Sequence, residues 1–128
     1  MTTVHWLAAP DDHDFPAAAD YLSLLAGADE IGALVAQWRR AEIEMHKAKD
    51  VLRAARLDLL PAEDEHVASD LRKIHHHTPL SPVLLVRGDL ARGVPLQIAD
   101  GYHRVCASYL TEENTDIPCL LATPTSTA

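Results

Sequence analysis

The sequence contains few aromatic residues, few cysteines and no long apolar stretch, and each shortage excludes a class of protein. Aromatic residues make up 5% of the 128 positions, so Leu, Val, Ile and Ala must form most of the core. No stretch reaches the roughly 18 apolar residues that a membrane-spanning helix needs, and the first residues do not resemble a signal peptide. We therefore expect a soluble, cytoplasmic protein with no membrane partner.

Cysteine is limited to Cys106 and Cys119, which do not form a CxxC pair. A chain of this length can bury a core without a disulfide. We expect both thiols to be reduced and buried as small apolar groups. A reactive Cys106 is the alternative, because His103 and Arg104 are close to it in sequence.

Positive charge is also scarce. The chain has 11 Lys and Arg residues against 19 Asp and Glu, which gives a formal net charge of −8. Because affinity for nucleic acids comes largely from Lys and Arg beside the phosphates, we do not expect nucleic acid as the main partner. A local positive cluster in residues 47–56 is either a solvated helix face or the border of a phosphate site.

The periodicity of apolar residues predicts one α/β (α+β) domain that spans residues 1–128. Steps of three and four residues predict helices over 14–25, 29–40, 45–55 and 64–74, with Asp14 as the cap of the first. Residues 57–61 are expected to be extended. Runs rich in β-branched residues predict strands over 82–87, 95–99 and 117–121, with a helix from residue 102 between the last two. A flexible tail is expected over 123–128.

The most site-like segment is Asp100-Gly101-Tyr102-His103-Arg104, which follows a predicted strand and opens a predicted helix. Backbone N–H groups at a helix N-terminus are unpaired and favour negative charge. Glycine allows an anion to approach the backbone, and arginine can hold a phosphate with two parallel hydrogen bonds. The segment therefore predicts an anion site, with phosphate as the expected anion.

Two other features have competing explanations. Asp100 is either a ligand for Mg²⁺ or a ribose hydroxyl, or it is a helix cap or a salt-bridge partner of Arg104. Three consecutive histidines at 75–77 are better explained as an exposed helix end than as a metal site, because consecutive side chains point in different directions. We therefore expect no metal site built from histidine and cysteine.

This order of elements resembles the ParB/sulfiredoxin superfamily. The resemblance rests on the Gly101-Tyr102-His103-Arg104 turn, on the Pro-Val-Leu-Leu-Val strand before it and on the strand at 117–121 after it. It covers residues 57–122, with 57–61 as the first strand, and leaves 1–56 as an all-helical N-terminal extension. It implies a small mixed sheet with flanking helices.

In that superfamily the glycine turn and the following arginine bind nucleotide phosphates, ATP in sulfiredoxins and CTP in ParB proteins. The resemblance therefore implies that Gly101, Tyr102, His103 and Arg104 bind ATP or CTP with Mg²⁺. Sulfiredoxins have a catalytic cysteine where this chain has Tyr102, so we do not expect sulfinic acid reduction. ParB proteins continue into a DNA-binding domain and this acidic chain does not, so we do not expect a partition protein.

Three functions remain open at this stage. The first is a nucleotide- or phosphate-binding protein with a regulatory role. The second is a phosphotransferase or nucleotide hydrolase on the same fold that uses Asp100 and His103. The third is a non-catalytic protein-interaction module, and a homodimer through the N-terminal helices is a further option. Binding ranks first, because no complete set of nucleophile, base and stabilising groups is visible.

Overall fold

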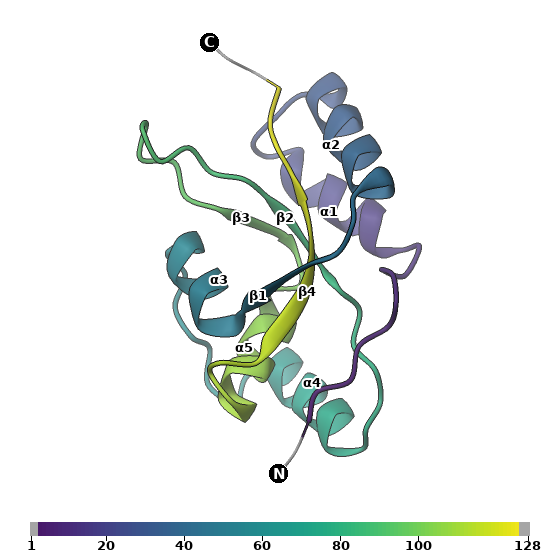
Figure 1. Cartoon of the computed structure of the whole chain (residues 1–128), viewed down its shortest axis with the longest axis vertical. Helices are drawn as coiled ribbons and strands as arrows, with labels where there is room; N and C mark the ends of the chain where they lie inside the picture. The colour runs from purple at the N-terminus through teal and green to yellow at the C-terminus, as the bar shows by residue number, and fades with distance from the viewer. Residues whose placement is uncertain (1–2, 126–128) are drawn as a thin grey trace.

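The computed structural model describes residues 3–125, in which five helices and four strands form a mixed α/β fold (Figure 1). The elements follow one another along the chain as α1 Asp14–Leu22, α2 Ala28–Arg40, β1 Glu44–Lys47, α3 Ala48–Ala55, α4 Glu65–His75, β2 Val83–Val86, β3 Gln97–Asp100, α5 Tyr102–Thr111 and β4 Asp116–Ala122. In this part of the chain, no helix has the length and apolar character needed to cross a membrane.

The four strands form one mixed sheet in the order β1-β4-β2-β3. β4 lies between β1, with which it is antiparallel, and β2, with which it is parallel. β2 and β3 form an antiparallel hairpin with an irregularity between Leu84 and Leu85. The parallel β2–β4 pair requires a crossover, and α5 lies within it, as is usual for such connections.

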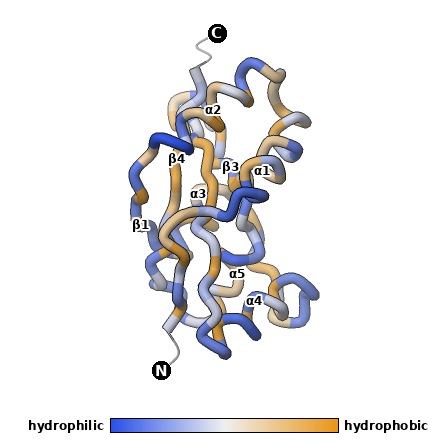
Figure 2. Tube along the Cα trace, turned by 90° about the vertical axis from the view of Figure 1, so that its right-hand side faces the viewer, coloured by the Kyte–Doolittle hydropathy of each residue, from blue (hydrophilic) through white to orange (hydrophobic). Residues whose placement is uncertain are grey.

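Helices cover both faces of the sheet, which gives three layers. Successive side chains of a strand point to opposite faces, so Leu84 and Val86 pack with α1 and α2, whereas Val83 and Leu85 pack with α3, α4 and α5. Trp38 on α2 is 1% exposed, and its indole N–H donates to the carbonyl of Leu85 at 2.9 Å. Figure 2 shows the hydrophobic trace of β4 inside the molecule and hydrophilic segments on the outer loops.

Most of the predicted elements are confirmed with small changes of boundary. α2, α4, β2, β3, α5 and β4 all occur where the apolar pattern predicts them. α1 ends earlier than predicted, at Leu22, and a turn follows. Asp14 does not cap α1, because it is the first helical residue and its Oδ2 accepts the N–H of Asp11 at 3.1 Å. Of the expected tail, residues 126–128 lie outside the described range.

The prediction is wrong for residues 44–47. The apolar pattern predicts a helix over 45–55, but α3 begins at Ala48, and Glu44–Lys47 form the edge strand β1. This strand forms because its backbone pairs with β4, with His46 opposite Ile117. The N-terminal 56 residues are therefore not an all-helical extension. Residues 57–61, expected as the first strand, form no strand of the sheet.

Candidate functional site

The expected strand, glycine turn and helix are present at residues 97–111. β3 ends at Asp100, Gly101 has a φ of 115°, and α5 begins at Tyr102. A Cβ atom at residue 101 would lie 2.4 Å from Cγ1 of Val83 in the neighbouring strand. Both the left-handed backbone and the close approach of β2 therefore require glycine here.

Arg104 folds back over this turn toward the end of β3. Its Nη2 lies 2.8 Å from Oδ2 of Asp100 and 3.3 Å from the carbonyl oxygen of Pro82. The two side chains are largely buried, with 16% of Arg104 and 18% of Asp100 exposed. Of the alternatives for Asp100, the salt bridge with Arg104 is therefore formed. The Nε of Arg104 is buried and has no hydrogen-bond partner among the described residues.

A hollow of about 250 Å³ lies between α4 and the start of α5. The residues that line it are His66, Ser69, Asp70, Lys73, Asp100, Gly101, His103 and Arg104. The N–H of Val105 donates to the carbonyl of Gly101 at 3.0 Å, so the N–H groups that precede it in α5 have no i−4 partner within the helix. Three predicted site residues, Gly101, His103 and Arg104, are thus brought together.

The α4 residues of the hollow were not predicted as part of the site. His66, Ser69, Asp70 and Lys73 are spaced at i, i+3, i+4 and i+7, which places them on one face of α4. That polar stripe is visible in the sequence beside the apolar stripe of Val67 and Ile74. The stripe becomes part of a site only because α4 packs against α5, and the local sequence does not predict that packing.

Asp70 is surrounded by the positive side chains of the hollow. Its carboxylate lies 3.8 Å from Nζ of Lys73. Burial raises the pKa of Asp70, and the charges of Lys73, Arg104 and His103 oppose this rise. Burial likewise raises the pKa of Asp100, against the hydrogen bond from Arg104. The hollow therefore combines cationic groups with two carboxyl groups whose ionised forms are destabilised by burial.

His103 lies at the rim of the hollow beside α4. Its ring centroid is 4.8 Å from that of His66, and its Nε2 is 4.0 Å from Oδ1 of Asp64. Asp64 caps α4 by accepting the N–H groups of His66 and Val67, both at 3.0 Å. Hydrogen bonding from Val67 contributes most to lowering the pKa of Asp64. His103 thus combines partial exposure with a carboxylate neighbour.

Tyr102 and Cys106 point away from the hollow. The hydroxyl of Tyr102 donates to the backbone carbonyl of Asp58, so this side chain links α5 to residues 57–61. Cys106 is fully buried in the core, and burial raises the pKa of its thiol. Burial raises the pKa of Cys119 to about 12. Both thiols are free and buried, as expected, so the alternative of a reactive Cys106 is not supported.

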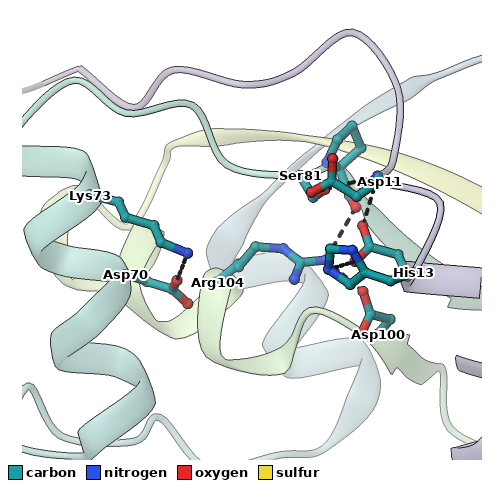
Figure 3. A network of polar contacts seen from close by, with 9 residues as sticks. Asp11, His13, Asp70, Lys73, Ser81, Asp100 and Arg104 are labelled. Atoms are coloured by element: carbon teal, nitrogen blue, oxygen red, sulfur yellow. Dashed lines mark hydrogen bonds and ion pairs between the residues drawn. The ribbon is translucent and has the colours of Figure 1, made fainter. Parts of the chain in front are cut away.

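Figure 3 shows that an N-terminal loop extends the polar network beyond Asp100. His13 Nε2 lies 3.4 Å from Oδ1 of the buried Asp14, and Ser81 Oγ lies 3.2 Å from Oδ2 of Asp11. The ligand atoms of Asp11, His13 and Asp14 lie within 4.8 Å of one another. These contacts and the hydrogen bond with Ser81 join the N-terminal loop to the segment that precedes β2.

Other sequence features lie elsewhere. His75, His76 and His77 are exposed at and beyond the end of α4. Arg53 and Arg56 do not line the hollow at Gly101 but a different one, beside the β2–β3 hairpin. The positive cluster of residues 47–56 therefore does not border the expected phosphate site.

Comparisons of this chain with protein-family models, with curated proteins and with solved structures return no match.

Proposed function

We propose that this protein binds the phosphate group of a small ligand in the hollow between α4 and the N-terminus of α5. The expected ligand is a nucleotide, ATP or CTP, as the resemblance of the Gly101–Arg104 turn to the ParB/sulfiredoxin superfamily implies. The protein would then belong to the nucleotide-responsive, regulatory class rather than to the enzymes.

The observation that carries this proposal is the convergence of nitrogen donor groups, two of them the charged groups of Lys73 and Arg104, on one helix N-terminus. Lys73 and His66 reach the hollow from α4, and His103 and Arg104 reach it from α5. The first N–H groups of α5 add fixed donors and a favourable helix dipole. The buried Nε of Arg104 has no partner among the described residues. The oxygen of a phosphate bound in this hollow would be an acceptor close to that N–H group.

The size and donor set of the hollow fit part of a nucleotide. Small-molecule sites usually enclose about 300–1,000 Å³, so a hollow of about 250 Å³ suits a phosphate group whose nucleoside lies outside. Mg²⁺ prefers carboxylate and phosphate oxygens. Asp70 supplies such oxygens, and a bound Mg²⁺ would reduce the repulsion between its carboxylate and the phosphate.

Isothermal titration calorimetry with ATP, CTP, GTP and inorganic phosphate, with and without Mg²⁺, tests the proposal. Lys73→Ala is the most useful variant, because 51% of this side chain is exposed and its removal should leave the fold intact. We expect Lys73→Ala to weaken binding about tenfold. Lys49→Ala is the matched control, since Lys49 is exposed on α3 and does not line the hollow.

Absence of saturable binding to any of these ligands would rule out the proposal, as would equal loss in the two lysine variants. Product formation during the titration would favour the enzyme alternative with Asp100 and His103. We place binding ahead of catalysis because Asp100, the expected acid or base, is already engaged by Arg104 at 2.8 Å. Turnover lost in Asp100→Asn and His103→Ala would reverse that order.

A further inference from the structure

A second surface, away from the Gly101 hollow, combines arginines with exposed apolar residues. A hollow of about 390 Å³ lies between the C-terminal end of α3 and the β2–β3 hairpin. A neighbouring hollow of about 190 Å³ shares Ala54, Leu96 and Leu121 with it. The two hollows therefore form one groove, here named the hairpin groove, which runs from the hairpin along α3.

The floor of the hairpin groove is apolar, and its rim carries three arginines and two aspartates. The aspartates are paired, Asp50 with Arg53 at 3.1 Å and Asp89 with Arg92 at 3.5 Å. Leu96 and Leu121 are only partly buried there. Arg53, Arg56 and Arg87 stand at the rim, all exposed. Their contacts in the chain are few and exposed: Arg53 with Asp50 at 3.1 Å, Arg56 with the carbonyl of Gly93 at 3.1 Å, and Arg87 with Thr123 Oγ1 at 3.2 Å. Of these three contacts only Arg53 with Asp50 is an ion pair, and an exposed pair of this kind contributes little.

The tip of the β2–β3 hairpin projects from the sheet (Figure 1) and has a defined shape. Asp89 and Val94 exchange two backbone hydrogen bonds of 2.9 Å. Gly88 is required at its position, because a Cβ there would lie 2.3 Å from the carbonyl oxygen of Val94. This turn presents Leu90, which is 98% exposed, and Val94, which is 47% exposed, beside the hollow. The two residues add apolar surface next to arginines, and arginine is enriched at protein interfaces.

Arg56 adds evidence that the groove is maintained for its side chains. It ends α3 in the left-handed conformation, with a φ of 56°, a position at which glycine is the usual residue. The side chain of Arg56 reaches across the groove to Gly93. This conformation is strained for a residue with a Cβ, and it places the guanidinium of Arg56 at the rim.

We propose that the hairpin groove is a docking site for an acidic polypeptide segment of a partner protein that carries apolar side chains. Such a segment places its apolar side chains on the Leu96 and Leu121 floor and against Leu90. Its carboxylates meet the guanidinium groups of Arg53, Arg56 and Arg87, which bind carboxylates in a planar, bidentate manner. The continuity of the two hollows suits an elongated chain better than a compact small molecule.

Charge complementarity selects this occupant. Among the described residues, Arg56 and Arg87 have no carboxylate partner, so their guanidinium groups can bind the carboxylates of a partner. The chain as a whole carries a net charge of −8, which repels any large polyanion, a nucleic acid duplex included. A short acidic segment contacts the arginines of the rim alone. A second copy of this chain would bring its own overall negative charge, and that repulsion disfavours self-association.

Fluorescence anisotropy with the full chain and a labelled peptide in which two leucines stand among glutamates tests the proposal. We expect saturable binding that falls about tenfold or more in Arg53→Glu/Arg87→Glu. Leu90→Ser is a second variant, and its residue is too exposed for the change to affect folding. Arg40→Glu/Arg72→Glu is the matched control, because both arginines are exposed, lie outside the groove and undergo the same change of charge.

Four results would overturn the proposal. They are no saturable binding of the peptide, an equal loss in the control variant, undiminished binding of a peptide with every Glu replaced by Gln, and undiminished binding of a peptide with both Leu replaced by Ser. Stronger binding of a DNA duplex than of the peptide, lost in Arg53→Glu/Arg87→Glu, would instead assign the rim to nucleic acid. Concentration-dependent dimerisation that this variant abolishes would assign the groove to a second copy. These outcomes are independent of phosphate binding at Gly101.

Discussion

The Cβ position of Gly101 would lie 2.4 Å from Cγ1 of Val83, so the turn that opens α5 is in direct contact with the central part of the sheet. This contact joins the candidate site to the core. Gly101→Ala must move β2 or α5 and must also place alanine at a φ of 115°. We expect it to lower the free energy of unfolding by about 2–4 kcal/mol, measured by urea denaturation. Full stability in the variant would show that the two segments separate easily.

Gly32→Ala is expected to have the opposite effect. Gly32 lies inside α2, and a Cβ there would meet no atom within 4 Å. Alanine reduces the conformational freedom of the unfolded chain and favours the helix, so we expect a gain of about 0.5–1 kcal/mol in the free energy of unfolding. The same urea experiment measures this gain. A loss of stability would mean that this face of α2 is in a contact that the monomer does not contain.

Asp64→Ala removes the cap of α4, and its effect should depend on pH. The N–H groups of His66 and Val67 lose their acceptor, so we expect the melting temperature at pH 7 to fall by a few degrees. Because folding lowers the pKa of Asp64, its ionised form contributes stability above the unfolded pKa, about 3.9. That contribution is lost as the pH falls through the folded pKa. The difference between parent and variant should therefore shrink below about pH 4.

Asp70→Asn should show the opposite dependence on pH. Burial raises the pKa of Asp70 on folding, so the folded protein binds the proton more tightly than the unfolded chain does. Stability is then lost as the pH rises from about 3.9 through the raised pKa. The Asp70→Asn variant lacks this ionisation and keeps the stability that the parent loses. We therefore expect the difference in stability between variant and parent to change in favour of the variant as the pH rises, measured by thermal denaturation from pH 3.5 to 7.

A constant difference between Asp70→Asn and the parent across this range would contradict the assigned role of burial. Lys73→Ala in the same experiment separates the two contributions. Removing the ammonium 3.8 Å from the carboxylate should increase the loss of stability with rising pH.

Much of the fold is predictable because the signals are local. Asp64 before the apolar stripe of Val67 and Ile74 predicts α4, and the structure confirms both the helix and its cap. Asp100 and Gly101 between an apolar run and a helical stripe predict the strand, the turn and α5, all of which are present. Each of these elements is determined by propensity and periodicity over a few adjacent residues.

The tertiary structure decided the features that depend on distant partners. Glu44–Lys47 has no strand signal of its own and becomes β1 only because it pairs with β4, about 70 residues later. Asp70 and Lys73 join the Gly101 hollow because α4 packs on α5, and Arg53 and Arg87 meet at one rim because α3 lies beside the hairpin. The sequence by itself determined the helices and strands that have a local signal, with β1 as the exception. Which side chains share a site was decided by packing between elements, whose contacts span the whole chain.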